Sequence, residues 1–163
     1  MDFFEIIEGR ASVRGYEAVD VPREDIEAVL DAGRRAPSGN NIQPFEFIVV
    51  TDKAVIQQLS APQGFIAEAS ALIAIVADSS ASTYWLEDIS AAATQMLLAI
   101  HALGYASCWV EGTLLRKEAE MKQVLGVPDN LRLMIFLPIG NASSPPTQPA
   151  KKSLDDLVHW GKY

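Results

Sequence analysis

The sequence contains few of the residues that build disulfide frameworks or metal sites. Among 163 residues there are one cysteine, Cys108, and two histidines, His101 and His159. A single cysteine excludes an internal disulfide framework, and so few nitrogen and sulfur ligands supply a metal site poorly. We expect Cys108, beside Trp109, to be a small core residue, with a redox-active thiol as the alternative.

Positive charge is scarce as well. The chain has 13 lysines and arginines against 21 aspartates and glutamates, a formal net charge of −8. With no basic excess to neutralise phosphates, we expect no binding of nucleic acid and no attachment to acidic membranes. Any anion that the protein binds must be held by a local group of cations.

Long hydrophobic runs are missing. The longest ones, such as ALIAIVA at residues 71–77, are far shorter than the ~20 residues that span a bilayer. The first ten residues, MDFFEIIEGR, include acidic side chains where a secretory signal is basic, so we expect a cytoplasmic protein. No G-x-G-x-x-G or G-x-x-x-x-G-K-[ST] sequence follows an apolar run, which argues against the usual nucleotide-binding loops.

The chain does contain enough apolar sequence for one core. Hydrophobic residues make up 49% and charged residues 21%, as is typical of a globular protein. This length predicts one domain, and no internal repeat or boundary interrupts the chain. After Gly140 the composition changes to the Pro- and Ser-rich run NASSPPTQPAKK. We therefore expect a single domain over residues 1–163, with 141–163 as an extended C-terminal tail.

Hydrophobic periodicity predicts alternating helices and strands. The helices are expected at residues 2–9, 22–35, 52–60, 88–104 and 116–125, and the strands at 45–51, 71–77, 105–110 and 131–139. Asp2, Asp52 and Asp88, or a residue just before Asp88, are the expected N-caps. Taken alone, this alternation favours a parallel, doubly wound sheet.

The connection between the second helix and the first strand is unusually elaborate. Residues 35–50 read RAPSGNNIQPFEFIVV, with about ten polar or turn-forming residues where ~2–6 are enough to link a helix to a strand. One interpretation is a turn and a helix terminus that need Asn and Gly for backbone reasons. The other is a loop that binds something.

A second unusual segment, RASVRGY at residues 10–16, follows the first helix. Arg10, Ser12 and Arg14 are spaced by two, so in an extended segment their side chains point the same way. Two guanidinium groups and a hydroxyl on one face suit a phosphate or another anion. The alternative is a pair of surface arginines that form ion pairs with nearby glutamates.

Two further segments follow along the chain, YASCWVEG at 105–112 and KKSLDDLV at 151–158. Together, from Asp2 to Val158, the four segments resemble the nitroreductase family of FMN-dependent oxidoreductases. In that family an R-x-S-x-R segment is followed by P-S-x-x-N-x-Q-P-aromatic, a buried helix, a strand that ends in Gly, and a basic-Leu-acidic-acidic tail. The resemblance implies an α+β, three-layer α/β/α fold with a central, mostly antiparallel sheet, in an intertwined homodimer.

The resemblance also implies how FMN is held. The residues of the same chain are expected to be Arg10 and Lys151 or Lys152 at the phosphate, Ser12 at the ribityl chain or phosphate, Arg14 at the N1 edge, and Glu111 with the backbone N–H of Gly112 at N5. Gln63 is a further candidate at the N3–C4 side of the ring, with an ordinary loop glutamine as its alternative. No catalytic side chain and no metal are expected, because the flavin carries the chemistry.

In this family the polar loop serves the partner subunit. The resemblance implies that Pro37, Ser38, Gly39 and Asn41, with Gln43, cover the FMN of the partner, with Pro37 and Ser38 touching the ring. Asn40 is expected to face the substrate. The chain departs from the pattern in three places. Phe45 replaces a frequent Trp, lysines replace arginine in the tail, and the sequence between Ser60 and Ala69 is short, which predicts an open pocket.

The implied activity is FMN-dependent transfer of two electrons from NAD(P)H to a nitroaromatic, quinone or similar conjugated acceptor by a ping-pong mechanism. One alternative is a flavin-binding module without turnover. Another is a specialised family member of the dehalogenase or flavin-fragmenting type. The expected partners are a second copy of the chain, NAD(P)H and small electron acceptors.

Overall fold

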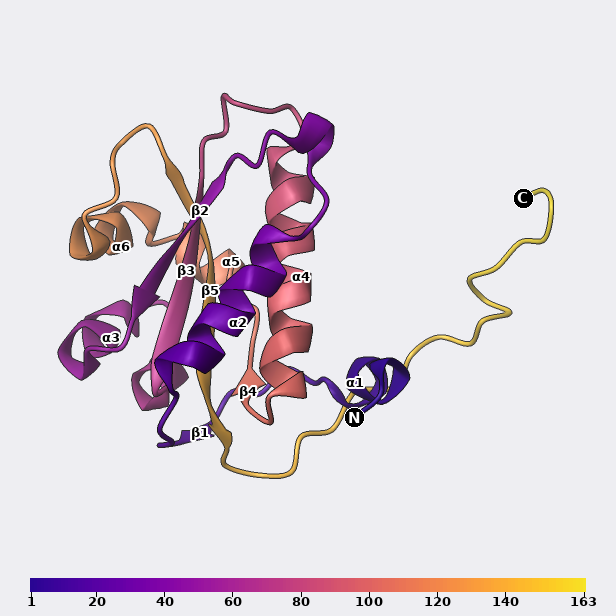
Figure 1. Ribbon diagram of the computed structural model, residues 1–163, viewed down its shortest axis with the longest axis horizontal. Helices are drawn as coiled ribbons and strands as arrows, with labels where there is room; N and C mark the ends of the chain where they lie inside the picture. Colours follow the sequence, from indigo (N-terminus) through magenta and orange to yellow (C-terminus); the bar gives the residue numbers. More distant parts are fainter.

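The computed structural model describes all of residues 1–163, with a five-stranded sheet between two layers of helices (Figure 1). The strands are β1 (Tyr16–Glu17), β2 (Phe45–Val50), β3 (Ala71–Ala77), β4 (Ala106–Ser107) and β5 (Arg132–Ala142). They are ordered β1-β5-β3-β2, and β4 also pairs with β5. Every named pair is antiparallel, which confirms the fold that the family resemblance implies.

The parallel sheet suggested by the alternation of elements is wrong, and the connection from β2 to β3 gives the reason. This connection contains helix α3 (Lys53–Leu59) and the 3-10 helix η2 (Gly64–Glu68). At ~1.5 Å per residue α3 is about 10 Å long, roughly half the length of β2. The chain therefore re-enters the sheet at the end where it left, and β3 runs antiparallel to β2 from Phe45 opposite Ala77.

The two faces of the sheet are covered by different helices. Helices α2 (Arg23–Arg34) and α4 (Trp85–Ala102) pack on one face, where Ile73 and Ile75 of β3 point. Helices α3, α5 (Gly112–Leu115) and α6 (Glu118–Leu125) pack on the other, against Leu72 and Val76. All seven residues of β3 are buried, as its continuous apolar run predicts.

The helix ends show where local sequence signals succeed and where they fail. Asp2 caps α1 (Phe3–Gly9) and Asp52 caps α3, both as expected. Asp88 is not the N-cap of α4, because that helix begins at Trp85 and Tyr84 stands at the cap position. The carboxylate of Asp88 instead accepts a hydrogen bond from the backbone N–H of Gly39, far away in sequence.

Several expected boundaries also need correction. The third strand covers only 106–107 instead of 105–110, and β5 continues to Ala142, so the tail starts two residues later than expected. The last helix begins at Glu118 and not at Arg116, and the separate short helix α5 precedes it at residues 112–115. Sequence patterns did not predict β1, α5, η2 or the 3-10 helix η1 (Gly39–Asn41). These elements are too short for hydrophobic periodicity to show in the sequence.

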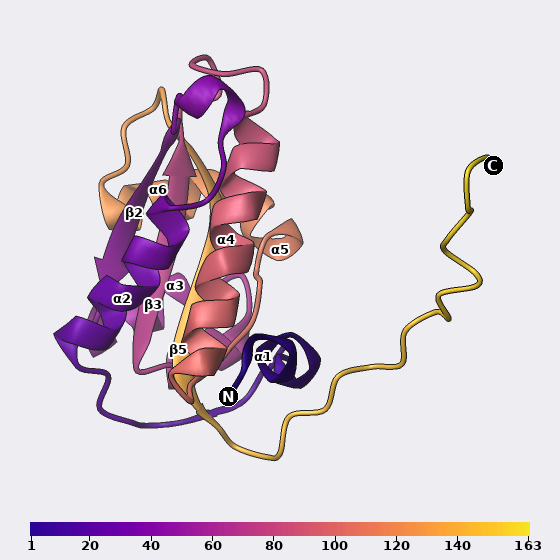
Figure 2. The same cartoon turned by 45° about the vertical axis from the view of Figure 1, so that its right-hand side comes forward.

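The tail leaves the body of the molecule after β5 (Figure 2). Its one side chain that forms hydrogen bonds to the body is that of Gln148, whose Nε2 donates to the carbonyl oxygens of Ile7 at 3.2 Å and Arg10 at 2.9 Å. Every residue from 149 to 163 is exposed, including Trp160 at 93%. None of the helices combines the length and the apolar surface that crossing a membrane would require.

Candidate functional site

The segment Arg10–Arg14 runs as an extended chain beside β4. Ser12 forms a parallel bridge with Ser107, and the N–H of Val13 donates to the carbonyl oxygen of Ser107 at 2.9 Å. Ala11 is buried, while Ser12 and Arg14 are exposed. This is the alternation that a spacing of two predicts, so Ser12 and Arg14 share the outer side, while Arg10 at the start of the segment is half-buried.

Tyr16 holds the end of this segment in place. Its hydroxyl donates to the carbonyl oxygen of Val13 at 2.7 Å, and its N–H donates to Oε2 of Glu68 at 3.1 Å. Burial is the main cause that raises the pKa of Tyr16, so the phenol remains a neutral donor. The path of the chain around Arg14 is therefore fixed by hydrogen bonds in which the arginine side chain takes no part.

Cys108 lies beneath the cationic face. It is 1% exposed, which confirms the prediction of a core position. Burial raises the pKa of its thiol, and this outweighs the opposing effects of nearby Arg14, Ser12 and Arg10. The thiol is therefore protonated at neutral pH, and the thiolate that redox or nucleophilic chemistry needs is not formed.

The chain that leaves β4 brings three of the predicted residues together. Glu111 precedes α5, which begins at Gly112, and Oε2 of Glu111 accepts from Nε1 of Trp109 at 2.9 Å. Gln63 reaches the same place, where its Nε2 donates to Oγ1 of Thr113 at 3.2 Å. Sequence reasoning missed Thr113, since a contact across 50 residues leaves no local signal.

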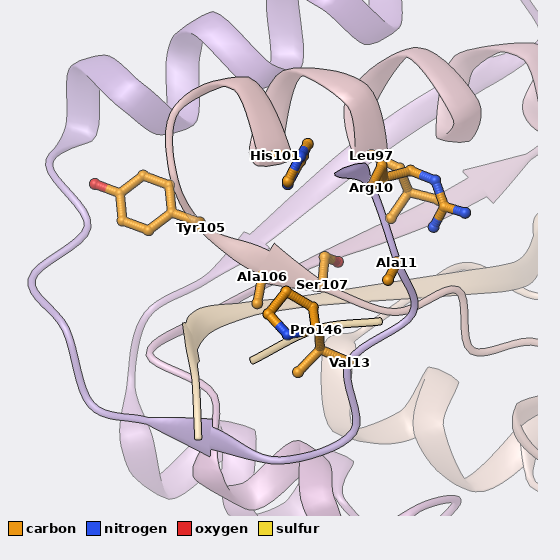
Figure 3. Close-up of a pocket in the computed structure, with 9 residues that line it drawn as sticks. All are labelled: Arg10, Ala11, Val13, Leu97, His101, Tyr105, Ala106, Ser107 and Pro146. Carbon is orange, nitrogen blue, oxygen red and sulfur yellow. The ribbon is translucent and has the colours of Figure 1, made fainter. Parts of the chain in front are cut away.

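The inner side of the segment borders a small cavity (Figure 3). Nine residues from α4, β4, the turn between them, the segment and the tail line it: Arg10, Ala11, Val13, Leu97, His101, Tyr105, Ala106, Ser107 and Pro146. Its volume is about 20 Å³, about the space of one water molecule. Nε2 of His101 and Oγ of Ser107 are buried without a hydrogen-bond partner. Burial, followed by the charge of Arg10, lowers the pKa of His101.

The polar loop 37–43 lies at the opposite end of the molecule from the cationic segment (Figure 1). Asp88 near the start of α4 contacts the loop, and His101 in the last turn borders the cavity behind Arg10. Thirteen residues of helix separate them, or ~20 Å. Within one chain, the structure does not bring the loop and the cationic segment together.

The loop has an unusual backbone. Three of its non-glycine residues have left-handed φ angles, Asn40 at 51°, Asn41 at 56° and Gln43 at 54°. Left-handed conformations cost ~1–2 kcal/mol for ordinary residues and less for Asn, and they concentrate at functional sites. The backbone interpretation of this sequence is therefore supported, because Asn residues occupy left-handed positions. The interpretation as a binding loop stays a prediction.

The predicted tail lysines, Lys151 and Lys152, are exposed and contact no other predicted residue of the chain. They follow Gln148 by three and four residues, and Gln148 is bonded to the carbonyl oxygen of Arg10. At ~3.5 Å per residue they lie within about 14 Å of that anchor along the chain. No group of three or more His, Cys, Asp and Glu residues is arranged to hold a metal ion.

Comparison with known proteins gives a consistent result. The family model described as "Nitroreductase family" matches residues 7–63 and 60–141. The chain belongs to the nitroreductase family. A relative from Archaeoglobus fulgidus, which has the provisional name NADH dehydrogenase/NAD(P)H nitroreductase, is 36% identical over 140 residues, covering 80% of each chain.

Two solved nitroreductase-family structures have the same fold. A protein from Bacteroides thetaiotaomicron with the same provisional name is 30% identical, has a TM-score of 0.89 and covers 98% of this chain and 97% of its own. An FMN-dependent nitroreductase from Clostridium difficile is 28% identical, has a TM-score of 0.87 and covers 99% of this chain and 100% of its own.

Proposed function

We propose that this protein is an FMN-dependent oxidoreductase that uses NAD(P)H to reduce nitroaromatic, quinone or similar conjugated acceptors. The observation that carries the proposal is the convergence of segment 10–14, Gln63 and residues 111–113 around the exit from β4. FMN held by these residues would supply two-electron chemistry, with hydride uptake from NAD(P)H and transfer of two electrons to the acceptor.

The donor groups of this chain fit such a cofactor. Arg10 and Ser12 match a phosphate group, to which the tail adds Lys151 or Lys152 as a point charge. Arg14 supplies positive charge for the electron-rich N1 edge of the ring. The N–H of Gly112, the first residue of α5, has no carbonyl within its helix to bond and is available to N5.

The proposed working form is an intertwined homodimer, in which the loop 37–43 covers the flavin of the partner. Phe3, Phe4 and Ile7 of α1 are exposed apolar residues, as is Trp160 of the tail, and such side chains favour burial against another surface. Strand β2 also has one unpaired edge at the end of the sheet. The separation of ~20 Å within a chain between the loop and the cationic segment is what a site shared by two chains requires.

Titration of the protein freed of flavin tests this proposal. We expect flavin fluorescence to show one FMN per chain, and sedimentation to show a dimer at micromolar concentration. Total interface areas above ~2,000 Å² are usual for such obligate dimers. A monomer that still holds FMN would contradict the shared site, and a protein that binds no FMN would contradict the proposed function itself.

A further inference from the structure

Asp88 is the most deeply buried charged side chain of the molecule and has no ion-pair partner. It is 3% exposed, and none of the salt bridges of the chain includes it. Oδ1 accepts from the N–H of Gly39 at 2.8 Å, while Oδ2 is buried without a partner. Its position in the first turn of α4, where the helix dipole favours negative charge, helps to stabilise it there.

This hydrogen bond is the single one that joins residues 37–43 to a different element. The other bonds of these residues stay inside the loop: the N–H of Gln43 donates to Oγ of Ser38 at 3.2 Å, and Nε2 of Gln43 donates to the carbonyl oxygen of Asn41 at 3.0 Å. Gly39 also packs closely against Tyr84, because a Cβ atom on Gly39 would lie 2.6 Å from the ring of Tyr84.

The hydrogen bond between Gly39 and Asp88 is not needed to keep the loop packed on the hydrophobic core. Asn40, Asn41, Ile42 and Gln43 are exposed, and a surface turn gains little from a buried charge that costs desolvation. A fixed position matters, however, when a loop must meet a ligand, because strained left-handed residues persist only where their surroundings hold them.

We propose that Asp88 is a positioning residue, which holds the 37–43 loop in the conformation that covers the flavin of the partner subunit. This inference rests on the proposed function, since it takes the loop to act on a bound FMN. Asp88 itself contacts no cofactor in this account and acts through Gly39.

The first test compares FMN affinity in three variants by flavin fluorescence. Asp88→Ala removes the acceptor, and we expect FMN to bind about tenfold more weakly, the effect of losing one charge-assisted hydrogen bond. Asp88→Asn keeps an oxygen that accepts from Gly39, and we expect it to restore affinity to within about twofold of the wild type. Glu120→Ala, which changes an exposed carboxylate in the first turn of α6 on the other face of the sheet, is the control and should leave affinity unchanged.

A second variant guards against a folding defect in Asp88→Ala. Gly39→Ala leaves Asp88 intact and displaces the loop through the ring of Tyr84, so it should weaken FMN binding by a similar factor. Circular dichroism should show that both variants keep their secondary structure. The inference is overturned if a folded Asp88→Ala or Gly39→Ala protein binds FMN as tightly as Glu120→Ala.

Mixed dimers separate this inference from the proposed function. When Arg10→Ala and Asp88→Ala chains are coexpressed, a hetero-dimer has one site with both defects and one site with neither. Random pairing in a two-fold dimer then gives about a quarter of all sites with wild-type affinity. If no such sites appear although Asp88→Ala alone weakens binding, the loop acts within its own chain. That result would contradict both the role of Asp88 in covering a partner's flavin and the shared site. Wild-type protein that binds no FMN would instead overturn the proposed function.

Discussion

Arg14 is exposed on the extended segment, and Tyr16 holds the neighbouring backbone through its hydrogen bond to the carbonyl oxygen of Val13. Because the arginine takes no part in these supports, Arg14→Ala should keep the fold. We expect it to weaken FMN binding and to lower the two-electron midpoint potential by about 30 mV, since the reduced ring loses a counter-charge worth ~1.5 kcal/mol.

Potentiometry of the flavin-bound variant is the measurement for this prediction. Arg23→Ala is the matched control, because Arg23 is exposed on α2 and forms its ion pair with Glu27. An unchanged midpoint potential in Arg14→Ala would make Arg14 an ordinary surface residue.

At the scale of single residues, His101 also predicts how the free energy of unfolding depends on pH. Burial and Arg10 lower its pKa in the folded protein, so below pH ~6.5 the unfolded chain binds the proton more readily. The free energy of unfolding should therefore fall as the pH decreases through 6.5 toward the folded pKa, in addition to the effect of the carboxylates.

Urea denaturation at pH 7.5 and 5.5 measures this contribution. The loss of stability between these two pH values should be smaller in His101→Gln than in the wild type. His159→Gln, which changes an exposed tail residue, should keep the wild-type difference. Equal pH dependence in all three proteins would show that His101 does not contribute.

At the scale of single elements, sequence patterns predict the long helices and strands and the helices whose N-cap bonds to nearby residues. Asp2 and Asp52 have their hydrogen-bond partners two and three residues away, and β3 is a continuous apolar run. Asp88 looks like an N-cap by the same local rule, yet its partner is Gly39, 49 residues away. The family pattern identified segment 10–14 and the polar loop, but not the contact between Gln63 and Thr113, because tertiary packing decides such pairs.

The tail is the element whose role depends most on assembly. If Lys151 and Lys152 meet the phosphate, Lys151→Ala/Lys152→Ala should weaken FMN binding roughly five- to tenfold, with a smaller effect at high salt. Riboflavin, which has no phosphate, should bind both proteins equally. Lys162→Ala is the control at the end of the tail.

Titrations with FMN and with riboflavin in parallel measure this effect. An equal loss of affinity for the two flavins would mean that the tail acts on the ring or on the fold and not on the phosphate. An unchanged affinity for FMN would remove the tail lysines from the site.

At the scale of the whole molecule, the proposed dimer would leave one face of a bound flavin ring open to substrates. NAD(P)H and a planar acceptor cannot occupy one face together at the roughly 3–3.5 Å that hydride transfer needs. Turnover should therefore be ping-pong. Double-reciprocal plots at several fixed acceptor concentrations should be parallel, whereas intersecting lines with a ternary complex would show two separate substrate sites.

The central claim is that this chain binds FMN and passes electrons from NAD(P)H through it. The most direct test is the visible absorption spectrum of the purified protein before and after anaerobic addition of NADH or NADPH. The account predicts the yellow flavin spectrum, its bleaching by at least one of the two nucleotides, and its return when a quinone is added. A colourless protein that takes up no FMN, or a flavin that neither nucleotide reduces, would contradict it.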